Sequence, residues 1–296
     1  MMEILRRTVC LLLVLALLMA GCAVWAEQDL AVNGDLDPAW KNILLLGTDK
    51  RPGETVARTD TMIILSVNKE EKTVRLTSLM RDMWVDIYGT NRSHKINAAN
   101  VYGGPEAAMA TVNHYFGLNI ERYILVDMDG MTEIINQLGG VDIPLTAAEA
   151  DSINQLILDD KIEDQEDVSE GESVHLTGEQ ATAYARIRSI GGDQQRTQRQ
   201  RTVLVAMAET LGEVSLWGMM GVGMTMLDYV ETNLSLSDLV DLCRTALDID
   251  LSGVQQIRIP ADGAYTMGKE EKSGLSVVWA NFEKNTEILH QFIYGE

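Results

Sequence analysis

The sequence predicts an α/β protein: an α/β/α layered domain with a central mixed sheet, which follows an N-terminal signal or anchor segment. From about residue 41 onward, short apolar runs of strand length alternate with longer segments of helical periodicity. The composition, with 46% hydrophobic and 23% charged residues in 296, is that of a globular chain able to bury a core. These two observations favour strands and helices packed in layers.

Strands are expected where a short apolar run ends in turn residues. The first such run covers residues 42–46 and ends at Gly47, and the polar turn 68–72 separates the next two. The expected strands are residues 42–46, 61–67, 73–79, 83–87, 123–128, 141–144 and 256–260.

Helices are expected where apolar residues recur at helical spacing between capping signals. Residues 97–116 are helical in pattern on both sides of a Gly103-Gly104-Pro105 break, and Thr177-Gly178-Glu179-Gln180 is a capping box that opens a later helix. The expected helices are residues 97–116, 130–138, 181–188, 197–211, 215–229, 237–247 and one from Asn281. Because no repeat or second linker interrupts them, residues 41–296 are expected to form one domain.

The first 26 residues differ from the rest of the chain. Arg6 and Arg7 precede the apolar run 9–20, a pattern typical of an export signal. Residues 1–26 are thus expected to be a signal peptide or membrane anchor, and residues 27–40 a linker. Cleavage before Glu27, lipidation at Cys22 and retention as an anchor all stay open. Each option places the remaining chain outside the cytoplasm, associated with the cell membrane or secreted into the cell wall.

The charge balance excludes some classes of partner. With 24 basic and 44 acidic residues, the net charge of -20 argues against nucleic acid as a partner, and export argues against direct regulation of transcription. The acidic segment 159–172 is expected to be a solvated loop, because it lacks the alternating acids and central glycine of a calcium loop. Cys243 alone follows the signal, so the exported chain is expected to have no intrachain disulfide.

Basic residues are concentrated in one place. Five arginines fall between residues 186 and 201 of this acidic chain, and those at positions 196 and 199 are expected on one helical face. They are suited to a ligand with several phosphate oxygens, since the planar guanidinium binds such oxygens in pairs. Ion pairing with the many nearby carboxylates is the alternative.

Two carboxylates lie at the ends of expected strands. Asp49 follows the first strand and Asp60 precedes the second, where an α/β domain tends to bind ligands. Together they are able to share one hard cation such as Mg²⁺, which takes one or two carboxylates and completes its shell with water and phosphate. Alternatively, Asp60 caps a turn and Asp49 pairs with Lys50 or Arg51.

A series of short blocks runs through these same stretches, from about residue 41 to residue 211. The blocks are Asn42-Ile43-Leu44-Leu45-Leu46-Gly47-Thr48-Asp49, Arg58-Thr59-Asp60-Thr61, Ser78-Leu79-Met80-Arg81-Asp82, Lys95-Ile96-Asn97-Ala98-Ala99, Leu138-Gly139-Gly140-Val141-Asp142, Leu176-Thr177-Gly178-Glu179-Gln180-Ala181 and Tyr184-Ala185-Arg186-Ile187-Arg188, followed by Asp193, Arg196 and Arg199-Gln200. In this order and spacing they resemble the LytR-CpsA-Psr family of cell-envelope proteins.

The resemblance implies an extracytoplasmic, magnesium-dependent phosphotransferase at the membrane surface. Such an enzyme takes an anionic glycopolymer, of the teichoic acid or capsule type, from a polyprenyl-diphosphate carrier and joins it to a peptidoglycan hydroxyl. By matching position, Asp49 and Asp60 would hold Mg²⁺, and the lipid tail would enter an apolar tunnel. The diphosphate would be bound by Arg81, Arg186, Arg188, Arg196 and Gln200, and the catalytic set would be Asp49, Asp60, Arg81, Arg186 and Arg188.

Some positions and roles stay open. Met80 replaces the proline common before the Arg-Asp pair, and Lys50 stands where a small polar residue is usual. Arg58 and Arg199 either assist the site or form structural ion pairs, and Asp82 is a conceivable general base or a turn partner. The main rival function is a non-catalytic polyprenyl-phosphate binder or wall-assembly scaffold, and hydrolysis of the diphosphate without an acceptor is a third.

Overall fold

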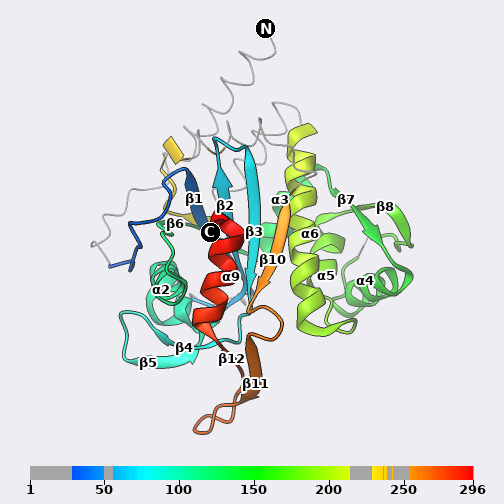
Figure 1. Cartoon of the computed structure of the whole chain (residues 1–296). Coiled ribbons are helices and arrows are strands. Elements are labelled where there is room, and N and C mark those ends of the chain that lie inside the picture. The colour runs from blue at the N-terminus through cyan, green and yellow to red at the C-terminus, as the bar shows by residue number, and fades with distance from the viewer. Residues whose placement is uncertain are drawn as a thin grey trace. The chain divides into compact units, whose positions relative to one another are not determined.

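The computed structural model describes residues 29–49, 56–163, 165–213, 229–235, 237, 238, 242 and 254–295 (Figure 1). The chain divides into two compact units. In the described part, residues up to 126, 231–235 and 254–295 form what we call the sheet unit, and most of the remainder, residues 127–213, forms the helical unit. The expected segment 1–26 and nearly all of the expected helices 215–229 and 237–247 lie outside the described residues, and the single domain expected over 41–296 stays a prediction.

The sheet unit is built on a six-stranded mixed sheet with the order β10-β3-β2-β1-β6-β9. β1, β2 and β3, which follow one another in the chain, form an antiparallel meander, and β10 runs parallel to β3. The predicted α/β class and mixed sheet are therefore confirmed. The strands are β1 (Trp40–Thr48), β2 (Thr59–Asn68), β3 (Thr73–Leu79), β6 (Arg122–Asp127), β9 (Val230–Thr232) and β10 (Gln255–Ile259).

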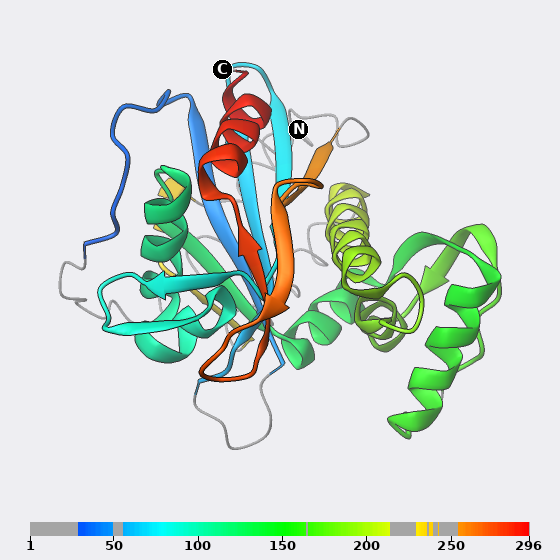
Figure 2. The same ribbon diagram turned by 60° about the horizontal axis from the view of Figure 1, so that its bottom comes forward.

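One face of this sheet carries two helices that share its hydrophobic core. α2 (Ala99–Phe116) and α9 (Phe282–Tyr294) pack against each other, and their buried side chains join those of β1 and β2 in one cluster (Figure 2). The expected break in α2 is confirmed, since Gly103 and Gly104 leave helical geometry inside it. The helix expected from Asn281 is α9, and Asn281 caps it by accepting a hydrogen bond from the Lys284 N–H.

Two short hairpins extend the sheet unit at its lower end in Figure 1. They are β4 (Trp84–Ile87) with β5 (Arg92–Lys95), which leads through η1 (Ile96–Ala98) into α2, and β11 (Tyr265–Lys269) with β12 (Ser276–Ala280). The sequence pattern predicted β4 and missed the other three strands. β5 and β11 are short and largely exposed, so they lack the apolar run on which a sequence prediction depends. β12 does carry such a run, with Val277 and Val278 buried, and was overlooked.

The helical unit has a separate core. It consists of α3 (Met128–Leu138), β7 (Val141–Leu145), α4 (Ala147–Asp159), β8 (Gly171–Leu176), α5 (Gly178–Arg186) and α6 (Gly192–Glu213). The predicted capping box of α5 is confirmed, with Thr177 and Gln180 bonded in both directions. A Cβ on Gly178 would lie 2.1 Å from the Thr132 carbonyl oxygen of α3, so only glycine permits this close packing of α3 and α5.

Two elements of the helical unit were not predicted. α4 begins with a second capping box, formed by Thr146 and Glu149, and β8 pairs antiparallel with β7. β8 is mostly exposed, so its sequence has no apolar pattern typical of a strand. Its strand conformation depends on pairing with β7. Within the described ranges, no helix has the length and apolar character needed to cross a membrane.

Candidate functional site

The end of the β1–β2 pair brings two candidate ligands together. Gly47 lies opposite Thr61, but the next residue, Thr48, lies opposite Thr59. Asp60 is therefore the extra residue of a β-bulge, and Asp49 directly follows Thr48. A bulge bends a strand and re-aims its side chain, and bulges are common beside active sites. The register thus places both carboxylates at the same end of this strand pair.

Gly47 allows β1 and β2 to pack closely beside the bulge. A Cβ built on Gly47 would lie 2.9 Å from the Cβ of Thr61, closer than real side chains approach. Any larger residue would force β1 and β2 apart directly beside the bulge. The glycine in the Asn42–Asp49 block therefore has a packing reason next to the two carboxylates.

Arg81 is held against Asp60. Its Nη1 lies 2.7 Å from Asp60 Oδ1, with the Arg81 side chain 18% exposed and that of Asp60 29% exposed. Both groups are thus partly shielded and still accessible to a ligand. A guanidinium has five N–H donors in a planar fork, a geometry that also suits phosphate oxygens. Met80 stands where a proline is common, but the Arg81–Asp60 contact is present, and the Met80 side chain is buried in the core.

Asp82, the conceivable general base, has a structural partner. Its Oδ1 lies 2.7 Å from Lys95 Nζ, and its backbone carbonyl accepts a hydrogen bond from the Val278 N–H. Asp82 Oδ2 is 3.8 Å from Arg81 Nε. These contacts favour the interpretation that Asp82 fixes the segment beside Arg81 over the interpretation that it removes a proton from a substrate.

The segment after β5 ties the site together, a role that the sequence did not assign. The Asn97 N–H donates to the Arg81 carbonyl at 3.3 Å, and the Asn97 carbonyl accepts from Thr59 Oγ1 at 3.4 Å. Asn100 Nδ2 donates to the Ala57 carbonyl at 2.8 Å. Both asparagines are buried. The block Lys95–Ala99 therefore connects the bulge to the Arg81 segment, and its presence in the sequence was the signal that could have indicated this.

The arginines of α5 lie in the helical unit. Arg186 is the last residue of α5 and Arg188 follows two positions later, and both are exposed while Ile187 between them is buried. Arg186 Nη1 is 2.6 Å from Asp160 Oδ2, and both side chains are substantially solvent-accessible. Such a surface ion pair contributes little stability, so Arg186 is able to exchange Asp160 for a phosphate ligand.

The arginines of α6 are buried. Arg196 and Arg199 are each 3% exposed, and Gln200 is half-buried. Arg199 Nε lies 2.8 Å from Glu149 Oε1, and its Nη1 donates to the carbonyls of Ile187 and Ile190. Arg199 therefore joins α4 to the turn between α5 and α6, which favours the structural ion pair over a direct part in the site. The diphosphate-binding roles of Arg196 and Gln200 stay predictions.

Burial and this ion pair act in opposite directions on the titration of Glu149. Burial alone raises its pKa, but the hydrogen bonds from Arg199 and Thr146 outweigh it and hold the pKa below its usual value. Nearby, burial first and the negative charge of Glu149 second raise the pKa of Tyr184 to about 12. Glu149 is thus charged near pH 7, the state that its ion pair with Arg199 requires.

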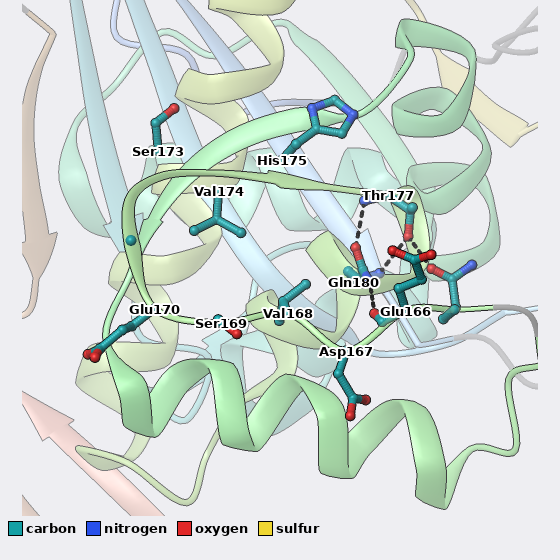
Figure 3. Close-up of a pocket in the computed structure, with 12 residues that line it drawn as sticks. Glu166, Asp167, Val168, Ser169, Glu170, Ser173, Val174, His175, Thr177 and Gln180 are labelled. Carbon is teal, nitrogen blue, oxygen red and sulfur yellow. Dashed lines mark hydrogen bonds between the residues drawn. The ribbon is translucent and has the colours of Figure 1, made fainter.

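The acidic loop of the helical unit frames a hollow of about 720 Å³ (Figure 3). Its charged side chains Glu166, Asp167 and Glu170 are exposed, as expected of a solvated loop. Its backbone is nonetheless held, since Gln180 Nε2 donates to the Glu166 carbonyl and Asn154 exchanges two hydrogen bonds with Val168. Three carboxylates at its rim make this hollow unsuited to a diphosphate.

The donor set at the bulge fits a magnesium ion. In the part of the chain that the structure describes, no three His, Cys, Asp or Glu side chains gather as a metal cluster. Magnesium needs no such cluster, because it usually binds through one or two carboxylates and keeps waters and substrate phosphates. Asp49 and Asp60 supply two hard oxygen donors at one strand end, and Asp49 is exposed.

Comparisons with known proteins identify the family of this chain. The chain matches the LytR_cpsA_psr family over residues 25–289. It is 33% identical over 225 residues to the polyisoprenyl-teichoic acid--peptidoglycan teichoic acid transferase TagU of Bacillus anthracis, covering 75% of this chain and 69% of that one.

Solved structures agree. TagT bound to LI-WTA has a TM-score of 0.70 at 25% identity, covering 92% of this chain and 99% of that one. The LytR-CPS2A-psr family protein YwtF (TagT) with bound octaprenyl pyrophosphate lipid has a TM-score of 0.66 at 24% identity over the same shares, and it is similar in fold.

Proposed function

The chain belongs to the LytR-CpsA-Psr family, and from that premise we propose that it is an extracytoplasmic transferase. Its donor is an anionic glycopolymer of the teichoic acid or capsule type on a polyprenyl-diphosphate carrier, and its acceptor is a peptidoglycan hydroxyl. Support comes from TagU, whose name states this transfer, and from TagT, a structure of which carries LI-WTA. The family match and the 33% identity reach across most of this chain.

One observation of this chain carries the proposal: the Asp60–Arg81 pair at the β1–β2 bulge. Phosphoryl transfer depends on positioning the diphosphate and on neutralising charge on the transferred group. Arg81 supplies a fixed cationic donor group, and the carboxylates beside it supply cation ligands. The hydrogen bonds of Asn97 and Thr59 hold both segments in register before substrate arrives.

The proposed reaction forms one bond and breaks one. The acceptor hydroxyl oxygen bonds to the phosphorus that carries the glycopolymer, and the bond from that phosphorus to the polyprenyl-phosphate oxygen breaks. The products are a glycopolymer phosphodiester on peptidoglycan and polyprenyl phosphate, and the hydroxyl proton is released to solvent or a base. Arg81 would stabilise charge on the phosphoryl oxygens, and Arg186 and Arg188 would bind the diphosphate.

We further propose that Asp49 and Asp60 hold a magnesium ion. When bound, the ion would supply positive charge against the diphosphate oxygens. Asp60 would then serve two partners, the ion and Arg81, and its bulge position keeps its carboxylate at the strand end where both lie.

The test follows transfer of a labelled polyprenyl-linked saccharide to peptidoglycan fragments by the full chain. Transfer by the wild type, with accumulation of polyprenyl phosphate, is the expected result. Arg81→Ala should abolish transfer, while Arg122→Ala, which changes an arginine on β6, should leave it intact. Tight binding of the lipid with no transfer to any peptidoglycan fragment would contradict the proposal and favour a non-catalytic binder. Formation of polyprenyl phosphate and a glycopolymer phosphate in the absence of acceptor would instead identify a hydrolase.

A further inference from the structure

Four rings form a continuous group in the sheet unit, which we call the aromatic platform: Trp84, His94, Tyr102 and Trp279. The centroid of Trp84 lies 5.7 Å from that of His94, in a stacked arrangement, and 6.2 Å from that of Trp279. His94 in turn lies 5.9 Å from Tyr102. The rings come from β4, β5, α2 and β12, so the tertiary fold assembles them.

The platform is open to solvent at both ends. Trp279 is 41% exposed and Tyr102 is 36% exposed. Trp84 and His94 between them are partly buried. Large aromatic side chains normally bury their surface, and connected rings that reach solvent indicate a binding surface. In a chain with only 5% aromatic residues, composition alone does not account for such a group.

The platform is held rigidly. The Trp279 indole lies over Gly268 of the neighbouring strand, where an added Cβ would stand 3.2 Å from its Nε1. The Arg92 guanidinium lies 4.7 Å from the centre of the Tyr102 ring. His94 Nδ1 accepts the Lys95 N–H at 2.8 Å, which assigns the ring proton to Nε2 when the ring is neutral. Rings fixed in this way lose little conformational entropy when they bind a ligand.

The platform adjoins the Asp60–Arg81 pair. The residue before Trp279, Val278, donates its N–H to the Asp82 carbonyl at 2.9 Å, and Lys95, the residue after His94, binds the Asp82 carboxylate at 2.7 Å. Asp82 is the residue after Arg81. The two strands that carry Trp279 and His94 are therefore bonded to the residue after Arg81, which places the platform and the Asp60–Arg81 pair on neighbouring segments of the sheet unit.

The charges around the platform suit a weakly charged saccharide better than a polyanion. Arg92 lies against Tyr102, but Asp86 on the same hairpin accepts a hydrogen bond from Ser93, so charges of both signs are present. A glycopolymer with a phosphate in every repeat would favour a wholly cationic surface. Peptidoglycan glycan strands are chains of N-acetylated amino sugars, with apolar C–H faces and acetyl methyl groups that pack against aromatic rings.

We propose that the aromatic platform binds the glycan strand of the peptidoglycan acceptor and directs its hydroxyl toward the Asp60–Arg81 pair. This proposal rests on the proposed transferase function, and it names residues that select the acceptor. The aromatic rings would contact the sugar faces, and the Nε2–H of His94 would donate to a sugar hydroxyl or acetyl oxygen.

The experiment measures binding of glycan strands freed of their stem peptides, by calorimetry with the full chain. Trp279→Ala and Tyr102→Ala should each weaken binding by about tenfold, the size expected for losing one aromatic contact. Met267→Ala is the matched control, because Met267 lies on the same β11–β12 hairpin, is 70% exposed and is outside the platform. Trp279→Phe keeps a ring and should retain most of the affinity. If Trp279→Ala proves poorly folded, Tyr102→Ala and Trp279→Phe together still test the contribution of the rings.

Kinetics separate acceptor binding from donor binding. The platform variants should raise the KM for the glycan acceptor and leave the KM for the lipid-linked donor unchanged. Glycan affinity equal to the wild type in Trp279→Ala and Tyr102→Ala would overturn the proposal. Loss of donor binding alone, or of binding to anionic phospholipid vesicles alone, would also overturn it and assign the platform to the glycopolymer or to the membrane. A wild type that binds glycan through these rings yet transfers nothing would contradict the transferase function and leave the platform standing.

Discussion

Arg81 and Asp60 are ion-paired across two segments distant in sequence, with Arg81 Nη1 2.7 Å from Asp60 Oδ1. One residue expected to bind a cation thus contacts one expected to bind the diphosphate. The pair gives the site a preformed orientation, because each side chain limits the rotamers of the other. Asp60 would contribute through two partners, and this makes its substitution informative.

We predict that Asp49 and Asp60 act as one unit. Asp49→Ala or Asp60→Ala should remove most of the effect of magnesium on transfer, and the double variant should lose little more than either single variant. Residues that share one ion are non-additive, whereas independent acids give additive losses. Magnesium titrations of the transfer rate check this, with Glu71→Ala on the exposed β2–β3 turn as control. A double variant whose transfer rate still responds to magnesium like that of the wild type would refute the hypothesis of a shared magnesium site.

A second prediction concerns the arginines at the end of α5. Arg186→Ala and Arg188→Ala should each weaken binding of a diphosphate lipid by about 1.5 to 3 kcal/mol, the size of a charge-assisted contact. Both residues are exposed, so the free energy of unfolding should change by less than about 0.5 kcal/mol. Calorimetry with the lipid measures the first effect and chemical denaturation the second.

Asp160→Ala is the matched control for that series. It removes the surface partner of Arg186 while keeping the guanidinium, so diphosphate affinity should be retained. Affinity that falls as much in Asp160→Ala as in Arg186→Ala would show that the pair acts structurally.

The third prediction is that Arg199 stabilises the helical unit. Removing one partner of a buried pair leaves an uncompensated charge, and Arg199→Ala should lower the free energy of unfolding by about 3 to 5 kcal/mol. Because the folded-state pKa of Glu149 is lowered, its contribution is present above its ordinary value of 4.5 and is lost as pH falls through the folded pKa. Denaturation at several pH values should show this acid loss in the wild type and not in Glu149→Gln.

Glu106 should have the opposite pH dependence. Burial, aided by the negative charge of Glu231, raises its pKa above 4.5 in the folded sheet unit. The folded state then binds the proton more tightly than the unfolded state, so stability is greatest below 4.5 and declines as pH rises through the folded pKa. Glu106→Gln should be more stable than the wild type at pH 7 and lack this decline. Melting curves recorded from pH 4 to pH 8 test this prediction. The same dependence of melting temperature on pH in the wild type and Glu106→Gln would refute it.

Much of the chain was predictable because its signals are local. The β3 bounds coincide with the expected residues 73–79, since an apolar alternation between two turns defines a strand without reference to its partners. The α5 capping box and the α2 glycine break were likewise predicted, because hydrogen bonds and glycine conformations within a few residues of one another decide them. β8 was missed because it is mostly exposed and pairs with β7, on the other side of α4 in the chain, and β5 and β11 were missed because these exposed strands of short hairpins lack an apolar run.

Local patterns were sufficient to predict the α/β class, the strand ends that carry Asp49 and Asp60, and the arginine-rich stretch of α5 and α6. The folded chain was needed to see that Asp60 occupies a bulge and pairs with Arg81, that Arg199 is buried against Glu149, and that four rings from four elements meet in the aromatic platform. The reason is physical. Periodicity and capping depend on neighbouring residues, whereas ion pairs, strand register and ring contacts join residues far apart in the chain, and packing of the whole fold selects them.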